Sequence, residues 1–398
     1  MGPCMQIAIG YQVLSFDLSF RLKVIALPST VMDKLIWPQD PPPLRDCIPL
    51  AFMAKKWHIR HYKVGLCHFG GQMKSVTILA MLNTMAATVT GPMDVFYQAG
   101  VMWNFFNEKA ATPYFDVRLV TSDGKPFRCL NGARLIPDGA IHDVRKTDLI
   151  VVSSILDIEK VLARQGEVVD WLEAMHCRGA HIATICSGVF VLAETGLLDG
   201  KTATTHWGFA EQFKKRYPQI ELKLERLITD EGSLFCSGGY NAGIDLSLYL
   251  VEKYCGHEVA MQSSKSMISD IGRTTQAPYC MFQFRKDHND DQILAVQEWI
   301  EKNFNENLTY DRLARVSGMG RRTMERRFKT ATGETPLTYQ QSIRVEVAKR
   351  LLENESRSFD DITCQVGYED SSTFRKIFFK LTGLVPTEYR KKFQRMPA

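Results

Sequence analysis

Cys186 and His206 are the residues whose types and spacing most directly suggest chemistry. Cys186 follows a β-rich apolar run (180–185) and precedes Ser187, Gly188 and a helical stretch, which places it at a strand-to-helix turn. At such a turn, the start of the following helix would favour a thiolate. His206 comes 20 residues later and would bring an imidazole on a neighbouring loop. Alone, this pair is weak evidence, because a buried cysteine most often only packs in a core.

A second group of residues suggests contact with a polyanion. Residues 321–329 hold five basic residues and one acid. On a helical wheel of 100° per residue, Met324, Phe328 and Ala331 fall on one side. The other side carries Arg322, Glu325, Arg326 and Lys329. A basic helix is most often only a solvated surface, so its meaning depends on the elements around it.

Those elements are repeated within the last hundred residues. Five residues recur at a fixed offset of 50, with Phe328, Thr332, Gly333, Pro336 and Tyr339 returning as Phe378, Thr382, Gly383, Pro386 and Tyr389. In the first copy, Thr309 caps a short helix that Gly318 ends, and a second helix follows at about 321–331. Two short helices joined by such a turn form a helix-turn-helix. We therefore predict two such motifs, at about 309–331 and 358–381, in an all-α domain at 291–398.

The second motif is predicted to present the same kind of face as the first. Ser358 and Asp361 match a capping box. The helix over 371–381 would bury Phe374, Ile377, Phe378 and Leu381, and would expose Ser372, Arg375, Lys376 and Phe379. A spacer helix at 337–355 would span roughly 28 Å, close to the ~34 Å repeat of the major groove. The two exposed faces would then suit successive groove segments on one side of a duplex.

This arrangement closely resembles the DNA-binding domain of the AraC/XylS family of bacterial transcription regulators. The matching segment ends in Gly383-x-x-Pro386-x-x-Tyr389-Arg390 and covers about a quarter of the chain. The resemblance implies promoter DNA and RNA polymerase as partners. Carried over by motif position, the base-reading residues are Arg322, Glu325, Arg326, Ser372, Arg375 and Lys376, with Ser371 as a further DNA contact. Arg321, Arg327 and Lys329 would contact phosphates.

The segment before this domain alternates short apolar runs with helical stretches. Apolar runs lie at 76–82, 115–120, 149–152, 180–185 and 233–236, and helical stretches at 93–107, 167–177, 189–195 and 244–254. This alternation predicts a parallel sheet with helices on both faces. We place this α/β domain at 74–262 and a polar interdomain linker at 263–290.

The α/β segment resembles the PfpI-type members of the class I glutamine amidotransferase-like superfamily, which have a flavodoxin-like fold. The run from Ile185 to Trp207 and the early motif Gly91-Pro-Met-Asp94-Val carry this resemblance. It implies that Asp94 is the carboxylate beside Cys186 and that His206 is a pocket histidine. Two departures weaken a hydrolase interpretation. Ser187 stands where peptidase-like members place a catalytic histidine, and Ser153-Ser154 replaces the glycine-rich turn that supplies an oxyanion donor.

The fusion of the two domains resembles the GlxA-type branch of AraC regulators, whose α/β domain binds small metabolites rather than catalysing a reaction. It implies a non-enzymatic transcription activator whose effector is an amino-acid or quaternary-amine derivative. The residues expected at the effector site are Asp94, Ser154, Cys186, His206 and Asn241. Asn241 is included because the turn from Ser237 to Gly243 leads into a helix whose amides would face the crevice; its alternative role is a helix cap. The α/β superfamily also often forms homodimers.

Two other functions stay open at this point. One is a Cys186-dependent hydrolase or isomerase that carries an accessory DNA-binding domain. The other is a constitutive DNA-binding protein that no metabolite controls. A reactive thiol with measurable turnover would favour the first, and indifference to metabolites would favour the second.

Composition sets outer limits on these interpretations. The 398 residues, 45% hydrophobic and 23% charged, fit two or three folded domains and exclude a wholly disordered chain. The net charge of +5 is too small to argue for nucleic acid by itself. No apolar stretch approaches the ~18 residues of a membrane span, and no Lys or Arg precedes Arg21 as a secretory signal would require. We therefore expect a cytoplasmic location.

Cofactor motifs are absent from the sequence. The ten cysteines form no C-x-x-C pair, and no G-x-x-x-x-G-K-[ST], H-E-x-x-H or G-x-G-x-x-G motif occurs. We expect neither a metal nor a nucleotide cofactor.

Residues 1–72 differ from the rest of the chain. Trp37-Pro38 and Pro41-Pro42-Pro43 interrupt any helix or strand period, so we expect little stable structure there. We also consider that translation starts at Met73, because Gly70-Gly71 is what a purine-rich ribosome-binding site encodes when it is translated. N-terminal sequencing of the native protein tests this, and an intact Met1 would contradict it.

Overall fold

The computed structural model describes residues 5–9, 12–16, 22–25, 73–282 and 284–394. The chain divides into two units, 1–65 and 66–398, and each is described by itself. The first contains an antiparallel sheet in the order β1 (Met5–Ile9), β2 (Gln12–Phe16), β3 (Leu22–Ile25). Met5, Ile7 and Ile9 alternate with Gln6 and Ala8, which is a strand period. These strands depart from the expectation of little regular structure in the leader, whose remaining residues lie outside the described part.

The second unit begins with an α/β domain built on a seven-stranded sheet in the order β13-β14-β10-β9-β4-β5-β8. Its strands are β4 (Lys74–Leu79), β5 (Phe115–Thr121), β8 (Gly139–Ala140), β9 (Leu149–Val152), β10 (His181–Ile185), β13 (Ile228–Asp230) and β14 (Leu234–Ser237). Two-residue strands β6 (Phe127–Arg128), β7 (Arg134–Leu135), β11 (Thr202–Ala203) and β12 (Glu221–Leu222) form two separate ladders. Within the seven-stranded sheet all neighbours are parallel except β13, which pairs antiparallel with β14 at one edge. The predicted parallel sheet is confirmed.

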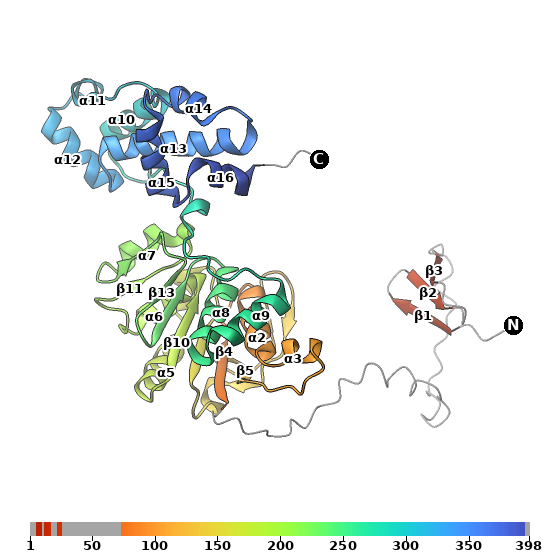
Figure 1. The fold of residues 1–398 in the computed structure, drawn as a ribbon. Helices are drawn as coiled ribbons and strands as arrows, with labels where there is room; N and C mark the ends of the chain where they lie inside the picture. Colours follow the sequence, from red (N-terminus) through yellow and green to blue (C-terminus); the bar gives the residue numbers. More distant parts are fainter. Residues whose placement is uncertain (1–4, 10–11, 17–21, 26–72, 283, 395–398) are drawn as a thin grey trace, which may run out of the picture. The chain divides into compact units, whose positions relative to one another are not determined.

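Helices cover both faces of this sheet (Figure 1). One face is covered by α2 (Ala87–Gln98), α8 (Ala242–Cys255) and α9 (His257–Met267), and the other by α4 (Ile158–Leu162), α5 (Gly166–Cys177), α6 (Val189–Glu194) and α7 (Ala210–Arg216). Strand β9 shows why two cores form, because Leu149 and Val151 enter one core while Ile150 and Val152 enter the other. This doubly covered parallel sheet is the flavodoxin-like architecture that the sequence predicts.

The chain is helical from Asp291 onward. Its helices are α10 (Asp291–Lys302), α11 (Tyr310–Ser317), α12 (Arg321–Thr332), α13 (Pro336–Asn354), α14 (Phe359–Gln365), α15 (Ser371–Thr382) and α16 (Pro386–Phe393). The pairs α11–α12 and α14–α15 are the two predicted helix-turn-helix motifs. Each packs around its own core, centred on Phe328 in the first motif and Phe378 in the second, and α13 contributes side chains to both cores.

Two element boundaries differ from the prediction. The expected helix at 93–107 is two helices, α2 and α3 (Met102–Phe106). They break at Gly100, whose φ of +76° and close approach to the Thr112 carbonyl leave no room for a side chain. Pro92 lies inside α2 instead of before it. Helix α9 also continues to Met267, past the predicted start of the linker at 263.

Candidate nucleic-acid interface and effector crevice

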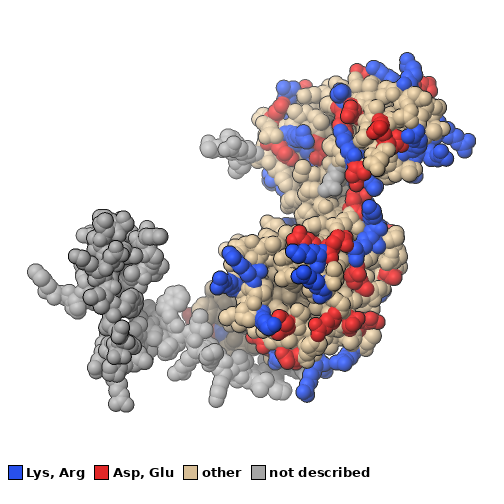
Figure 2. All heavy atoms as spheres, turned by 180° about the vertical axis from the view of Figure 1, so that it is seen from behind, with Lys and Arg blue, Asp and Glu red and all other residues tan. Residues whose placement is uncertain are grey.

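The first candidate surface is the outer face of α12. Gly318, with φ +65°, ends α11 and turns the chain into α12, whose buried side chains are Met324, Phe328 and Ala331. Arg322, Arg326 and Lys329 are exposed, and their side chains form no hydrogen bond or ion pair within the described part of the chain. Figure 2 shows Lys and Arg side chains gathered where Figure 1 places α11 and α12. Exposed cations without internal partners are available to phosphates and to guanine edges.

Arg321 and Glu325 pair with each other on the same helix. Arg321 Nε donates to Glu325 Oε1 at 3.0 Å, one helical turn away. The Arg321 guanidinium also lies 4.7 Å from the ring centre of Tyr310 on α11. A base contact by Glu325 would therefore have to compete with Arg321 for the carboxylate.

Arg327, whose side chain is 37% exposed, pairs with residues of its own domain. Its guanidinium makes two hydrogen bonds, of 2.7 and 2.9 Å, to Asp290, which caps α10. A third goes to Gln292 Oε1 at 2.7 Å. The hydrogen bonds from Arg327 hold the pKa of the Asp290 carboxyl below its usual range. These bonds join α12 to α10, so a phosphate contact by Arg327, which stays a prediction, would have to compete with Asp290 for the guanidinium.

The second candidate surface is the outer face of α15. Asp370 caps the helix by accepting from the backbone N–H groups of Ser372 and Thr373 at 3.0 and 2.9 Å. Hydrogen bonds from the hydroxyls of Thr373 and Ser372, together with those from the amides, lower the pKa of Asp370. Ser371 is half-buried in the first turn. The hydroxyl of Ser372 is already engaged as a donor to Asp370, which leaves it an acceptor for DNA.

Arg375 and Lys376 are both exposed on this face. The Arg375 guanidinium lies 5.0 Å from the ring centre of Phe359 on α14, which orients it. The Lys376 side chain forms no hydrogen bond or ion pair in the described part of the chain. The core side of the helix differs from the prediction at two positions: Ile377 is only partly buried, and Leu381 is 36% exposed while Thr382 is buried in its place. Thr382 can be buried because its hydroxyl donates to the Phe378 carbonyl at 2.8 Å.

A buried joint fixes the two motifs relative to each other. The loop after α10 offers the carbonyls of Phe304 and Glu306, and α13 supplies two side chains that bind them. Arg344, only 7% exposed, donates to these carbonyls at 2.6 and 2.8 Å, and Gln340 donates to both at 2.9 Å. From the second motif, Gly367 packs against the same loop so closely that a Cβ would lie 2.0 Å from the Asn305 carbonyl oxygen. The sequence shows nothing that marks Arg344 as buried.

Ser154, Cys186 and Asn241, which are predicted for the effector site, follow the ends of β9, β10 and β14. Cys186 follows β10 with φ +58°, the strained conformation of an elbow. Gly188 then passes so close to the Ser153 carbonyl oxygen that a Cβ would lie 2.6 Å from it. Burial raises the pKa of the Cys186 thiol to about 11, and hydrogen bonds with Ser187 oppose this only in part. Burial therefore opposes the thiolate that the start of the following helix would favour.

The hydroxyls around Cys186 are bonded to one another and to the backbone. The N–H of Ser154 donates to Thr88 Oγ1 at 3.2 Å, so this amide is not free to act as an oxyanion donor. Ser187 Oγ donates to the Ile155 carbonyl at 2.5 Å and accepts from the Ile155 N–H at 3.0 Å. Thr88 is a site neighbour that the sequence analysis missed, because the predicted helix at 93–107 left it in a loop.

His206 and Asn241 lie at the same end of the sheet. Thr205 Oγ1 donates to the Cys186 carbonyl at 3.0 Å, which holds the loop of His206 beside the elbow. His206 Nδ1 accepts from the Gly208 N–H at 3.0 Å, and burial lowers the pKa of the imidazole. A Cβ on Gly239 would lie 3.3 Å from the His206 ring, so the turn that leads to Asn241 packs against it. Asn241 is exposed and makes no side-chain cap to α8.

Asp94 is the predicted site residue that the structure does not join to the others. It is exposed on α2 and forms no hydrogen bond or ion pair in the described part of the chain. Thr88, one and a half turns earlier on the same helix, is the α2 residue that contacts the crevice through Ser154. The placement of Asp94 as a carboxylate beside Cys186 is therefore not supported by any contact.

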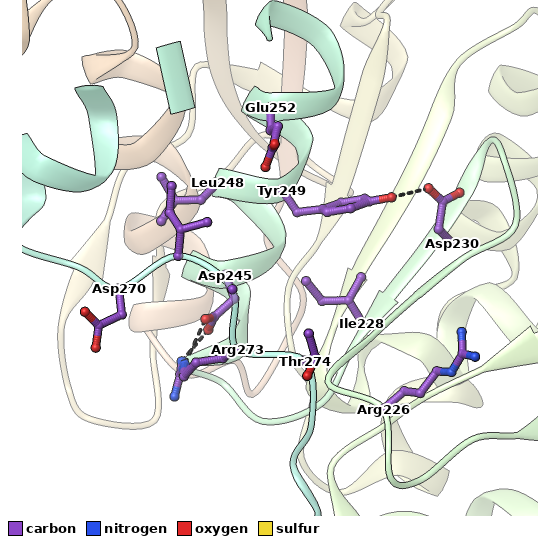
Figure 3. A pocket seen from close by; sticks show the side chains of 12 residues that line it. Arg226, Ile228, Asp230, Asp245, Leu248, Tyr249, Glu252, Asp270, Arg273 and Thr274 are labelled. Atoms are coloured by element: carbon purple, nitrogen blue, oxygen red, sulfur yellow. Dashed lines mark hydrogen bonds and ion pairs between the residues drawn. The ribbon is translucent and has the colours of Figure 1, made fainter. Parts of the chain in front are cut away.

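A cavity of about 390 Å³ opens elsewhere in the α/β domain, between β13, α8 and residues 270–274 (Figure 3). None of the predicted effector residues lines it. Its charged groups are largely paired: Arg273 Nε donates to Asp245 at 2.8 Å, and Asp230 accepts from Tyr249 and Lys253 at 2.5 and 2.6 Å. Such internal pairing is what holds the walls of this cavity together.

Within the residues that the structure describes, no group of three His, Cys, Asp or Glu side chains is arranged to hold a metal ion. Among the described helices, none is both long and apolar enough to span a bilayer.

The fold and the two surfaces define a class of protein: an α/β domain with a cysteine elbow, joined to a paired helix-turn-helix domain. Family models match both parts, the DJ-1/PfpI family over residues 74–253 and a helix-turn-helix domain over residues 313–392. The chain therefore belongs to the DJ-1/PfpI family through its α/β domain and carries an AraC-type helix-turn-helix domain behind it.

Individual relatives represent both halves of this combination. The HTH-type transcriptional regulator CdhR of Pseudomonas aeruginosa is 29% identical over 283 residues, which cover 68% of this chain and 80% of that protein. An isonitrile hydratase of Pseudomonas putida is 30% identical over 172 residues, covering 43% of this chain and 68% of the enzyme. The solved structure of Drosophila melanogaster DJ-1beta aligns over 50% of this chain and 100% of its own, at 21% identity and a TM-score of 0.43.

Proposed function

We propose that this protein is a sequence-specific DNA-binding transcription regulator, controlled by a small metabolite that binds the α/β domain without being turned over. The observation that carries the proposal is the repeated pair of recognition helices, each with a buried aromatic core side and an exposed cationic outer side. Similarity to relatives named as HTH-type transcriptional regulators supports it. We further propose that it activates transcription in the cytoplasm by contacting RNA polymerase at its promoters.

The two outer faces have different tasks in this proposal. On α12, Arg322 and Arg326 read bases, with Glu325 released from Arg321 where a cytosine amino group is present. On α15, Arg375 and Lys376 read bases. Ser371 and Ser372 offer their hydroxyls close to the DNA phosphate backbone. The 19 residues of α13 rise roughly 28 Å, which suits two faces bound about one groove repeat apart.

The effector is proposed to bind at the crevice around Ser154, Cys186, His206 and Asn241. The proposed effector is a small amino-acid or quaternary-amine derivative, and exposed Asp94 is its proposed counter-charge. The raised pKa of the buried Cys186 thiol and the engaged amide of Ser154 support binding without turnover. Effector binding would then change how the DNA-binding domain engages its site.

The experiment that tests the proposal combines site selection with two substitutions. The full-length protein selects its sequence from random duplex oligonucleotides at physiological salt, and genome-wide mapping of bound sites identifies the regulated genes. Arg326→Ala and Lys376→Ala should each weaken specific binding, because each removes a cation from an outer face. Lys160→Ala, which removes an exposed cation from the α/β domain, is the matched control. Unchanged affinity in both test variants would remove the assignment of the recognition faces.

An enzymatic function is the second candidate, because the isonitrile hydratase relative shares the α/β domain and Cys186 adopts an elbow conformation. It predicts turnover that Cys186→Ala abolishes while DNA binding is kept. A thermal-shift screen of metabolites separates the remaining alternative, since a constitutive DNA-binding protein would respond to none of them.

A further inference from the structure

Phe379 is an exposed aromatic residue on the outer face of α15. It lies two helical turns after Ser372 and close to one turn after Arg375 and Lys376, so all four share one side of the helix. Phe379 is 52% exposed, while its neighbours Phe374 and Phe378 are fully buried in the core. It forms no aromatic pair with any residue that the structure describes. Packing of the domain therefore does not account for a phenyl ring among Arg375, Lys376 and Lys380.

The internal repeat offers a direct comparison. The residue of α12 at the same repeat position is Lys329, which is also exposed. Both helices have 12 residues and both end at a left-handed glycine, Gly333 or Gly383, so their faces correspond residue by residue. One helix thus presents a cation and the other a phenyl ring at the equivalent place. The apolar group that base edges offer to a phenyl ring in the major groove is the 5-methyl of thymine.

We propose that Phe379 is a specificity-determining residue that contacts the 5-methyl group of a thymine in the half-site bound by α15. This inference rests on the proposed DNA-binding function. Arg375 precedes Phe379 by four residues, roughly 6 Å along the helix axis or about two base steps of 3.4 Å. The thymine therefore lies within about two base pairs of the base that Arg375 or Lys376 contacts. The cations beside the ring attract phosphates whatever the sequence, so Phe379 supplies selectivity that they do not.

The test uses the full-length protein and the duplex site that it selects from random oligonucleotides. Each thymine is replaced in turn by uracil, which lacks only the 5-methyl group. At one position in the α15 half-site, uracil should weaken wild-type binding roughly fourfold, because a methyl-sized group is worth ~0.8 kcal/mol and 1.36 kcal/mol is tenfold. Phe379→Ala and Phe379→Lys should bind thymine and uracil equally there. Leu381→Ala removes an exposed apolar residue from another side of α15 and should keep the wild-type preference.

The outcomes separate this inference from the function on which it rests. A wild-type protein that selects no sequence contradicts the proposed function itself. If the protein selects a sequence but binds thymine and uracil sites equally, Phe379 does not contact a thymine methyl group. The same conclusion follows if uracil weakens binding equally in wild type and Phe379→Ala. Both outcomes leave the proposed DNA binding intact. Because uracil changes only the DNA, a Phe379 variant that folds poorly cannot conceal the result.

Discussion

The equivalent glycines Gly318 and Gly367 end α11 and α14 in the two motifs, and replacing each with alanine should have very different costs. Both have positive φ, +65° and +86°, so alanine at either position is strained by about 1–2 kcal/mol. Beside Gly318 no atom lies within 4 Å of a new Cβ, and strain is the whole cost. Alanine also lowers the conformational entropy of the unfolded chain, which offsets about 0.4–1 kcal/mol of this strain. Gly318→Ala should therefore lower the free energy of unfolding by only about 1 kcal/mol.

Gly367→Ala adds a collision with the buried joint. Its Cβ would lie 2.0, 2.6 and 2.8 Å from the backbone oxygen, carbonyl carbon and Cα of Asn305, so the loop itself must move. That movement strains the four hydrogen bonds that Arg344 and Gln340 donate to the neighbouring carbonyls. At roughly 0.5–1.5 kcal/mol each, the loss of two of them brings the total cost to about 3 kcal/mol.

Hydrogen exchange measures both variants in the full-length protein. The slowest amides of α13 should lose about 1 kcal/mol of protection in Gly318→Ala and about 3 kcal/mol in Gly367→Ala. Affinity for the selected DNA site should also fall further in Gly367→Ala, because the joint sets the distance between the recognition helices. Equal protection in the two variants would show that the loop carrying Asn305 yields freely and that no rigid joint exists.

Three further predictions follow from the groups that the structure engages or buries. Arg327→Ala should destabilise the helical domain without changing which DNA sequence is selected. Arg322→Ala should change the selected DNA sequence without destabilising the domain. Melting curves and site selection measure the two effects. The pKa of Asp290 is lowered in the folded protein, so its contribution to stability is present above its unfolded pKa of about 3.9 and is lost as the pH falls through the folded value. In Arg327→Ala, the free energy of unfolding should therefore fall less steeply below about pH 4 than in wild type. Urea titrations measure it at each pH, and the same decrease in both proteins would contradict this. Cys186 should react with iodoacetamide slowly at pH 7 and faster as the pH approaches about 11, and fast alkylation at neutral pH would support an enzymatic thiolate.

The helical domain was largely predictable because local signals decide its elements. Glycines at the turns, the proline at the start of α13 and the 50-residue repeat locate α11 to α15 to within a residue or two. The wheel of α12 separates Phe328 from Arg326 correctly, since burial on a short helix follows its period. What the pattern does not reveal depends on partners distant in sequence. Nothing in it distinguishes Arg327, which pairs with Asp290, from the neighbouring Arg326, which forms no side-chain hydrogen bond or ion pair in the described part of the chain.

The predicted effector site in the α/β domain also depends on contacts between residues distant in sequence, which the pattern does not show. The sequence placed Cys186 at an elbow, and the structure has it there. A helix start lowers a thiol pKa and burial raises it, and only the packed structure shows that burial prevails. Thr88 was missed for a related reason: its role depends on facing Ser154 across 66 residues of chain. Pattern and resemblance identify which residues approach a site, but their protonation and hydrogen bonding are set by tertiary contacts.

The duplicated motif separates stability from selectivity on opposite sides of its helices. The inner position of Phe328 and Phe378 is the same in both copies, and the buried joint of Arg344 and Gly367 connects the two copies. Outer positions differ, with Lys329 in one copy and Phe379 in the other, and both are exposed. An outer residue with no internal partner can be exchanged at little cost in folding free energy, because no buried contact is lost. Exchanging Lys329 and Phe379 between α12 and α15 should therefore leave the melting temperature within a few degrees of wild type and move the thymine preference to the other half-site, and a large loss of stability would show that the outer faces also hold the fold together.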